Sequence, residues 1–395
     1  MSRAVGRTTP ILPLLTVLAA CGGSAPMPAA DTAAAIAGVS ATADLQDEHA
    51  LLRRGTYTRR NLVSDDQTAV PAEHQDANLV NAWGLDALPT TPWWVADNGT
   101  GLSTLYDGEG GAKSLVVSLP GAGGGQQAPS GLVANRTTEF TVTMGATTAP
   151  ARFLFASEDG TIDAWTLTTP PMTSAITVVP ADGAIFKGLT IAETRSGARL
   201  YATDFHNGVV RVWDGAFHPV TLPAGAFTDR HIPAGFAPFG IRELLGVVVV
   251  TYAKQDDAAK DDVKGPGLGF VDAYSTSGRL LARLATRGKL NAPWGLALSP
   301  LGFGPHSLRL LVGNFGDGHI LSFGLRRERH GDDDLDDDGV YLRDAQGPIT
   351  VDGLWALSFG TGPASGPGNT LFFTAGPDDE AHGLFGRIDF TPSMP

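Results

Sequence analysis

Short apolar segments, each opened by a glycine and a branched apolar residue, recur along most of the chain. The glycines of these segments are separated in turn by 47, 57, 52, 55 and 58 residues. With the residue that precedes each glycine, the six copies are Trp83-Gly84-Leu85, Ser130-Gly131-Leu132, Lys187-Gly188-Leu189, Phe239-Gly240-Ile241, Trp294-Gly295-Leu296 and Asp352-Gly353-Leu354. Self-similarity at a step of about 20–50 residues is typical of repeat folds.

A second apolar segment follows each glycine pair, and in most copies a third segment with glycine at its ends comes next. The second segments are rich in β-branched and aromatic residues, which favour strands. They lie at 93–97, 152–157, 199–204, 247–252, 308–314 and 370–375, and examples of the third lie at 160–167, 208–215 and 318–325. Six copies of a unit with three or four strands predict an all-β, six-bladed β-propeller, which leaves few open sheet edges. A pair of β-sandwiches is the alternative.

The last repeat lacks an outer strand of its own. After 370–375 only one clear strand remains, at 383–390. We therefore expect an N-terminal strand, Tyr57 to Ser64, to pair with the last blade and close the ring. The propeller domain would then cover residues 56–391 as a single unit, although the length of the chain alone suggests two domains.

The N-terminus resembles the lipobox of bacterial lipoproteins. Arg3 and Arg7 precede an apolar run at 11–20, and Leu18-Ala19-Ala20-Cys21 ends that run with the only cysteine of the chain. The pattern predicts a signal peptide at 1–20, a lipid on Cys21, and an Ala/Ser/Gly/Pro-rich flexible tether at 21–55. The protein would then be exported and held by lipid in the cell envelope, on the outer membrane or the periplasmic face of a Gram-negative bacterium. An ordinary secretory signal or a short anchor helix is the alternative.

The charge of the chain argues against nucleic-acid binding, and its cysteine content excludes an internal disulfide. The chain has 28 basic and 41 acidic residues, for a formal charge of −13. Nucleic-acid binding relies on lysine and arginine to neutralise phosphates, so nucleic acid is not an expected partner. A single cysteine also excludes an internal disulfide.

Polar residues follow the second strand of several repeats. In a propeller, equivalent turns lie on one face, so we expect these side chains to converge on the mouth of the central channel and to bind a ligand or calcium. The candidate ligand-binding residues are Asp97, Asn98, Asp204, His206, Asn207, Lys254, Asn314 and Asp317. The alternative is that Asp and Asn only make the turns in which they occur.

An aspartate-rich stretch and three tryptophans are further candidates. Asp334, Asp336 and Asp338, followed by a glycine, match the first half of a calcium loop, but Ala345 stands where the loop's bidentate glutamate belongs. This stretch predicts either weak calcium binding or a solvated loop at the periphery. Trp83, Trp294 and Trp355 are expected to pack between blades, with an aromatic ligand lining as the alternative.

Longer motifs resemble an uncharacterised family of exported bacterial propeller proteins, some members of which carry a PEP-CTERM sorting tail. The motifs include Asn78-Leu-Val-Asn-Ala-Trp-Gly-Leu85, Trp94-Val-Ala-Asp-Asn-Gly-Thr-Gly101, Phe155-Ala-Ser-Glu-Asp-Gly-Thr-Ile162, Tyr201-Ala-Thr-Asp-Phe-His-Asn-Gly208 and Leu311-Val-Gly-Asn-Phe-Gly-Asp-Gly318. The resemblance runs from about Asn61 to Phe390 and implies a fold and an exported location, but no reaction. The chain ends at Pro395 without the C-terminal anchor, which the lipid on Cys21 would replace.

The blades are also similar to NHL-repeat propellers and to the gluconolactonase/regucalcin group. The metal site of that group implies a glutamate before a Gly-Pro pair in the first blade, where this chain has Ala82-Trp83-Gly84-Leu85. We therefore expect a lipid-anchored module that binds a protein, glycan or small molecule through its channel face. The alternative is a calcium-dependent hydrolase or lactonase with Asp97, Asp204 and Asn314 as metal ligands.

Overall fold

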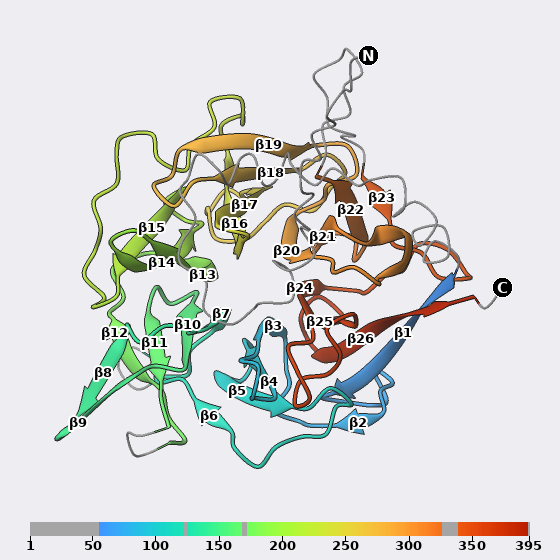
Figure 1. Ribbon diagram of the computed structural model, residues 1–395, viewed down its shortest axis with the longest axis horizontal. Coiled ribbons are helices and arrows are strands. Elements are labelled where there is room, and N and C mark those ends of the chain that lie inside the picture. The colour runs from blue at the N-terminus through green and yellow to red at the C-terminus, as the bar shows by residue number, and fades with distance from the viewer. Residues whose placement is uncertain (1–54, 122–124, 168–171, 326–338, 394–395) are drawn as a thin grey trace, which may run out of the picture.

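The computed structural model describes residues 55–121, 125–167, 172–325 and 339–393. Their strands form six sheets arranged radially around one axis (Figure 1). The first strand of each sheet contacts the first strands of both neighbouring sheets all the way round, so these strands line the axis. The predicted six-bladed β-propeller is therefore confirmed. The predicted signal peptide, Cys21 and nearly all of the tether lie outside the described residues.

Each of the first five blades is an antiparallel meander that begins at the axis and proceeds outward. Blades one to three contain β3 (Ala82–Asp86), β4 (Trp93–Asp97), β5 (Leu102–Tyr106) and β6 (Val117–Ser118), then β7 (Pro129–Ala134), β10 (Phe153–Ser157), β11 (Ile162–Trp165) and β12 (Ile176–Val179), then β13 (Phe186–Thr194), β14 (Gly197–Asp204) and β15 (Val209–Asp214). Blades four and five contain β16 (Phe236–Leu244), β17 (Val247–Lys254), β18 (Gly269–Tyr274) and β19 (Leu280–Thr286), then β20 (Pro293–Leu298), β21 (Arg309–Asn314), β22 (Ile320–Gly324) and β23 (Val340–Tyr341). A two-stranded hairpin of β8 (Thr141–Met144) and β9 (Thr147–Pro150) extends from blade two.

The sixth blade is completed by the N-terminal end of the described chain, as predicted. Its order is β24 (Leu354–Phe359), β25 (Leu371–Ala375), β26 (Leu384–Pro392), β1 (Gly55–Ser64) and β2 (His74–Gln75). Strand β1 pairs antiparallel with β26 from Gly55 to Ser64. The buried Tyr57 hydroxyl donates to the carbonyl of Phe303, 2.7 Å away, just before the 3-10 turn η3 (Gly304–His306) of blade five. The closing strand is therefore fixed to two blades.

The repeated glycine is explained by a close approach between neighbouring innermost strands. A Cβ atom on Gly131 of blade two would lie 2.5 Å from the backbone nitrogen of Leu189 in blade three. A Cβ atom on Gly295 of blade five would lie 2.5 Å from the carbonyl oxygen of Trp355 in blade six. Any larger residue would push the blades apart at the crowded axis, so the periodic glycines mark the packing of one blade on the next.

Side chains of one blade bond to backbone groups of the next blade's innermost strand. The Ser130 hydroxyl donates to the carbonyl of Phe186, 2.6 Å away, and the Thr203 hydroxyl donates to the carbonyl of Phe239, also at 2.6 Å. Innermost strands are edge strands, whose outward backbone groups have no ladder partner within their own sheet. The bonds between blades satisfy these groups, which stiffens the ring.

Large aromatic side chains fill the spaces between blades. Trp94 of blade one stacks on Phe153 of blade two, with ring centroids 4.2 Å apart, and Trp165 packs on both.

In the described part of the chain, no helix is long and apolar enough to cross a membrane.

Candidate functional site

The predicted ligand-binding residues lie at the end of the ring where the innermost strands begin. Each second strand runs antiparallel to the first, so its last residue lies beside the start of the first strand. Asp97 is thus the register partner of Ala82, and Asp204 that of Phe186. We call this end of the ring, formed by the starts of β3, β7, β13, β16, β20 and β24, the channel mouth.

Asp97 is fully buried inside its own blade and does not reach the channel mouth with its carboxylate. One carboxylate oxygen accepts a hydrogen bond from the Thr104 hydroxyl at 3.2 Å, and the other, Oδ2, has no partner in the described part of the chain. Burial raises the pKa of Asp97 well above its ordinary value, and the charge of Asp76 adds to the effect. The side chain therefore lies in a buried site that favours its protonated form.

Asp204 and Asn314 are turned toward the turns that follow their own strands. The Asp204 carboxylate accepts hydrogen bonds from the backbone nitrogen of Asn207 at 3.1 Å and from the Asn207 side chain at 2.8 Å. The Asn314 amide donates to Asp317 at 3.1 Å and to the carbonyl of Lys289 at 2.8 Å. The structure does not bring Asp204 and Asn314 together.

Of the remaining predicted residues, Asn98 joins a network that crosses blades. Its amide donates to Glu158 of blade two at 3.0 Å, and its side-chain oxygen accepts from Asn81 at 3.2 Å. His206 is exposed and lies with Nδ1 3.2 Å from the carbonyl of Ala259. Lys254 instead lies over the Phe236 ring, with Nζ 5.8 Å from the ring centroid.

The predicted calcium sites gain no support from the geometry. Among the residues that the structure describes, no three His, Cys, Asp or Glu side chains gather as a group suited to a metal ion. Asp334, Asp336 and Asp338 lie outside the described residues. A hydrolase with Asp97, Asp204 and Asn314 as metal ligands therefore has no assembled ligand set here.

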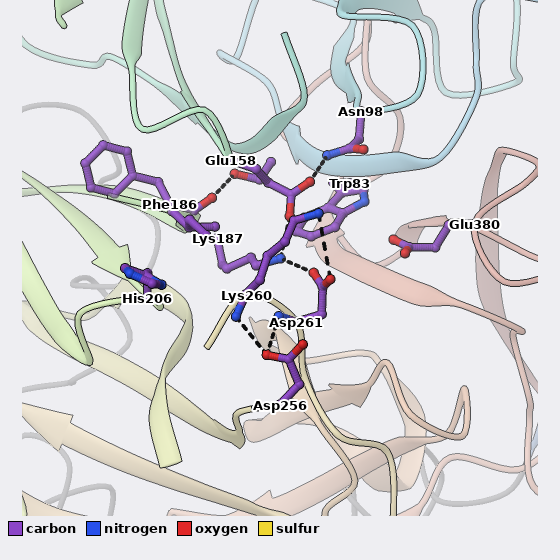
Figure 2. A network of polar contacts seen from close by, with 12 residues as sticks. Trp83, Asn98, Glu158, Phe186, Lys187, His206, Asp256, Lys260, Asp261 and Glu380 are labelled. Carbon is purple, nitrogen blue, oxygen red and sulfur yellow. Dashed lines mark hydrogen bonds and ion pairs between the residues drawn. The ribbon is translucent and has the colours of Figure 1, made fainter. Parts of the chain in front are cut away.

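Lys187 is the centre of the polar network at the channel mouth. It is the second residue of β13, and its residue is 2% exposed. Its ammonium group forms ion pairs with Glu158 of blade two and, at 3.0 Å, with Asp261 of blade four. Burial would lower the pKa of Lys187, but Glu158 and Asp261 outweigh burial and raise it. Figure 2 shows Lys187 between these acidic residues, with Asn98 bonded to Glu158.

Tryptophans form the floor beneath this network. Trp83 and Trp355 stack with ring centroids 3.6 Å apart, and Trp294 packs edge-on against both. The Lys187 ammonium lies 5.2 Å from the Trp83 ring centroid, and the Trp294 indole nitrogen donates to the Lys187 carbonyl at 3.0 Å. The expected inter-blade packing of the three tryptophans is confirmed. These rings separate the channel mouth from the opposite end of the channel.

A long loop between β17 and β18, residues 255–268, covers the channel mouth. Gln255 donates to the carbonyl of Phe205 in blade three, and Asp261 forms an ion pair with Lys187. On the other side, Lys264 pairs with Asp379 of blade six at 3.3 Å and lies 4.6 Å from the Phe315 ring centroid of blade five. The loop of blade four thus contacts blades three, five and six.

Acidic groups outnumber basic groups over the channel mouth. The two loops that meet there, 255–268 and 376–382, contain Asp256, Asp257, Asp261, Asp262, Asp378, Asp379 and Glu380 but only the lysines Lys260 and Lys264. Seven acidic side chains against two lysines leave an acidic surface, whereas the Lys187 ammonium offsets the charge of Glu158.

Two of these acids retain protons at unusually high pH. Burial raises the pKa of Asp262 to about 7, against the opposing charges of Lys187 and Lys264. Burial likewise raises the pKa of Glu380, although the Asn81 amide donates to it at 3.0 Å. The Oδ2 atom of Asp262 has no hydrogen-bond partner among the described residues. The channel mouth therefore contains acid groups that a nearby cation would help to ionise.

Sequence reasoning located the turn of Glu158 but missed Lys187, Asp261 and Glu380 as site residues. A signal was present for Lys187, because it precedes its repeat glycine at the position that Trp83 and Trp294 occupy in other blades. A buried charge at a position that is aromatic in three other blades requires a buried partner. No comparable signal indicates that Asp261, in a long loop, reaches across to another blade.

Comparisons with known proteins identify viral relatives. The chain is 30% identical over 325 residues to the uncharacterised protein R648 of Acanthamoeba polyphaga mimivirus, which covers 80% of this chain and 76% of that protein. It is 28% identical over 333 residues to the uncharacterised mimivirus protein L690, covering 81% and 82% of the two chains. A streptogramin B lyase structure superposes with a TM-score of 0.47 at 11% identity, covering 86% of this chain and 98% of that chain. No family model matches the sequence.

These relatives correct one expectation from the sequence. The assignment to an uncharacterised bacterial family of exported propellers is wrong, because the matching proteins come from a mimivirus. The motifs that suggested that family correspond to the repeated strands and turns of the blades, which a propeller of any origin requires.

Proposed function

Because the chain belongs to the family of the uncharacterised mimivirus protein R648, whose name records no activity, we propose a function from the site alone: the propeller is a binding module that recognises a positively charged organic group at its channel mouth. The group is a primary amine or guanidinium, carried by a small molecule or by a basic segment of a partner protein.

The observation that carries this proposal is the unbalanced charge around Lys187. This lysine is buried and faces two carboxylates, those of Glu158 and Asp261. The half-buried Glu380 and Asp262 add two acidic groups whose pKa values burial raises. A ligand cation placed among them would supply that charge and favour their ionised forms.

The arrangement also favours an organic cation over a bare metal ion. Metal ions require several oxygen ligands that converge at short distance, and the described residues contain no such group. Amine and guanidinium groups instead donate separate hydrogen bonds, which are longer than metal–oxygen bonds, to individual carboxylates. The Asn98 and Asn81 amides at the channel mouth provide further polar contacts for the body of such a ligand.

A membrane tether is the second part of the proposal. The N-terminal arginines, the short apolar run and the lone Cys21 support a lipid-anchored, exported protein. The propeller would then present its channel mouth to ligands outside the cytoplasm. This part depends on the sequence pattern and is independent of the charge argument.

The ligand class is tested by thermal unfolding with three probes at constant ionic strength: spermidine, maltose and citrate. We expect spermidine to raise the melting temperature in a saturable manner, because a ligand that binds only the folded state stabilises it. Maltose and citrate should leave it unchanged. A saturable shift with citrate or maltose, and none with spermidine, would overturn the proposed class.

The location is tested with paired variants. Asp261→Asn and Glu380→Gln should each weaken the spermidine effect. Asp107→Asn is the matched control, because Asp107 is also a partly exposed acid paired with a lysine, Lys113 at 2.6 Å, but belongs to the turn after β5. An equal loss in all three variants would mean that spermidine responds only to overall charge.

A further inference from the structure

The channel contains a small cavity beyond the tryptophan floor, at the end opposite the channel mouth. Its volume is about 50 Å³, which is room for roughly three water molecules. Branched apolar side chains from the innermost strands form most of its wall, namely Leu85, Leu132, Leu189, Ile241, Leu296 and Leu357. Three polar residues also line it: Asp86, Thr190 and Arg242.

Arg242 is the distinctive member of this wall. Its guanidinium donates to the carbonyls of Leu357 at 2.7 Å and Leu296 at 3.3 Å, and to the Ser358 hydroxyl at 2.9 Å. All three acceptors are uncharged, and no described carboxylate forms an ion pair with this side chain. Burial lowers the pKa of Arg242 below its ordinary value, although Asp86 opposes the effect. An arginine nevertheless keeps its charge in proteins.

The two nearby acids, Asp86 and Glu243, bond to other groups and not to Arg242. Asp86 pairs with a second arginine, Arg136, at 3.3 Å and also accepts a hydrogen bond from the backbone nitrogen of Ala134 at 2.9 Å. Glu243 accepts a hydrogen bond from the backbone nitrogen of Gly246 at 2.5 Å, in its own turn, and burial raises its pKa. Neither acid therefore forms an ion pair with the Arg242 guanidinium, whose hydrogen bonds all go to uncharged acceptors.

We propose that this cavity binds the carboxylate group of a small aliphatic monocarboxylic acid, with Arg242 as its counter-ion. The Thr190 hydroxyl accepts a hydrogen bond from the backbone nitrogen of Glu243 at 3.0 Å and can donate its own hydrogen to the ligand. Arginine presents donors in a planar fork that matches a carboxylate. The apolar wall would contact a short hydrocarbon tail.

Size and charge select this class of anion. One arginine without an ion-pair partner in the wall matches a monoanion, and an apolar wall would leave the additional oxygens of a phosphate dianion without donors. The volume admits an acid of two or three carbons but not an acid that contains a ring. The site is separate from the channel mouth, since the floor of Trp83, Trp294 and Trp355 lies between them.

Isothermal titration with sodium acetate and sodium propionate, at constant ionic strength, tests the site. Both acids should bind the wild-type protein, and sodium chloride should not compete at equal concentration. Arg242→Gln should weaken binding by about tenfold or more, because a hydrogen bond to a charged group contributes about 1.5–3 kcal/mol. Arg211→Gln is the matched control, since Arg211 pairs with Asp182 on the surface, and it should bind as the wild type does.

Asp86→Asn keeps the test decisive if loss of Arg242 disturbs the ring. Asparagine preserves an acceptor for the Ala134 amide but removes the competing negative charge, so acetate should bind several-fold more tightly. No heat with acetate or propionate in the wild type would overturn the proposal. Equal affinity for chloride and acetate, unchanged binding in a folded Arg242→Gln protein, or weaker binding in Asp86→Asn would also overturn it.

Discussion

The Nδ1 atom of His382 lies 2.9 Å from a carboxylate oxygen of Asp65, although 317 residues separate them in the sequence. Asp65 directly follows the closing strand β1, and His382 directly precedes the turn into β26. The second carboxylate oxygen of Asp65 accepts a hydrogen bond from the backbone nitrogen of Gly383 at 2.9 Å. This pair therefore joins the two chain segments that close the ring.

The Asp65–His382 pair makes ring stability depend on pH. The hydrogen bond from His382 to Asp65 raises the pKa of the histidine above 6.5. Its stabilisation is thus fully present below pH 6.5 and is lost as pH rises through the higher pKa of the folded state. Asp65→Asn, which keeps an acceptor for Gly383, should lower the melting temperature by about 2 °C at pH 5.5 and by less at pH 8.5. An equal loss at both pH values would contradict this account.

Truncation tests the role of β1 as a whole. Removal of residues 22–52 leaves β1 intact and should change the melting temperature little. Removal of residues 22–66 exposes the edge of β26 and removes the Tyr57 bond to Phe303, so unfolding should lose its cooperativity or the protein should aggregate. Calorimetry of both proteins makes the comparison. Identical unfolding curves would show that β1 is dispensable.

Asp262 is expected to reduce stability at neutral and higher pH. Its pKa is about 7 in the folded protein and 3.8 in a free side chain, so the folded state binds the proton more tightly. The resulting destabilisation is absent below pH 3.8, grows as pH rises, and is complete above pH 7. Asp262→Asn should raise the melting temperature by about 2–4 °C at pH 8 and leave it nearly unchanged at pH 4.

The charged form of Asp107 is expected to stabilise the protein at high pH, in contrast to that of Asp262. Burial would raise the pKa of Asp107, but the Lys113 ion pair and local backbone bonds outweigh burial and lower it. Asp107→Asn should therefore destabilise the protein at pH 8. If Asp262→Asn also destabilises it at pH 8, the carboxylate of Asp262 has a partner that this account omits.

The lipid anchor is tested at Cys21. Since Cys21 is the only cysteine, Cys21→Ser removes every site for a thioether-linked lipid. In a Gram-negative host the wild-type protein should fractionate with membranes and the variant with the soluble periplasmic or secreted proteins, as measured by immunoblot. Membrane retention of a full-length, folded variant would refute the anchor.

The repeat allowed the fold to be predicted from the sequence, but it did not determine the orientation of the turn side chains. Gly131 and Gly295 recur because neighbouring backbones touch at the axis, and that requirement is visible in the sequence. Asp204 and Asn314 were correctly located at the ends of second strands, yet each bonds to its own turn and to the adjacent segment of its own blade. Local donors lie closer to such a side chain than any group across the channel.

The network at Lys187 was unpredictable for a different reason. Its partners Glu158 and Asp261 come from a short turn in blade two and a long loop in blade four. The spacing of the repeat determines where a loop begins and ends, but it does not determine the direction in which a fourteen-residue segment, 255–268, packs. That direction follows from the bonds of the loop to Phe205 and Asn291, which only the folded ring brings together.

The most direct test of cation recognition at the channel mouth is the dissociation constant of spermidine, measured by isothermal titration for four proteins. These are the wild type, Asp261→Asn, the double variant Asp261→Asn with Glu380→Gln, and the control Asp107→Asn. Removing one and then two carboxylates should weaken binding by about threefold to tenfold at each step, while the control matches the wild type. Equal affinity in all four proteins, or tighter binding in the double variant, would contradict a cation site at the channel mouth.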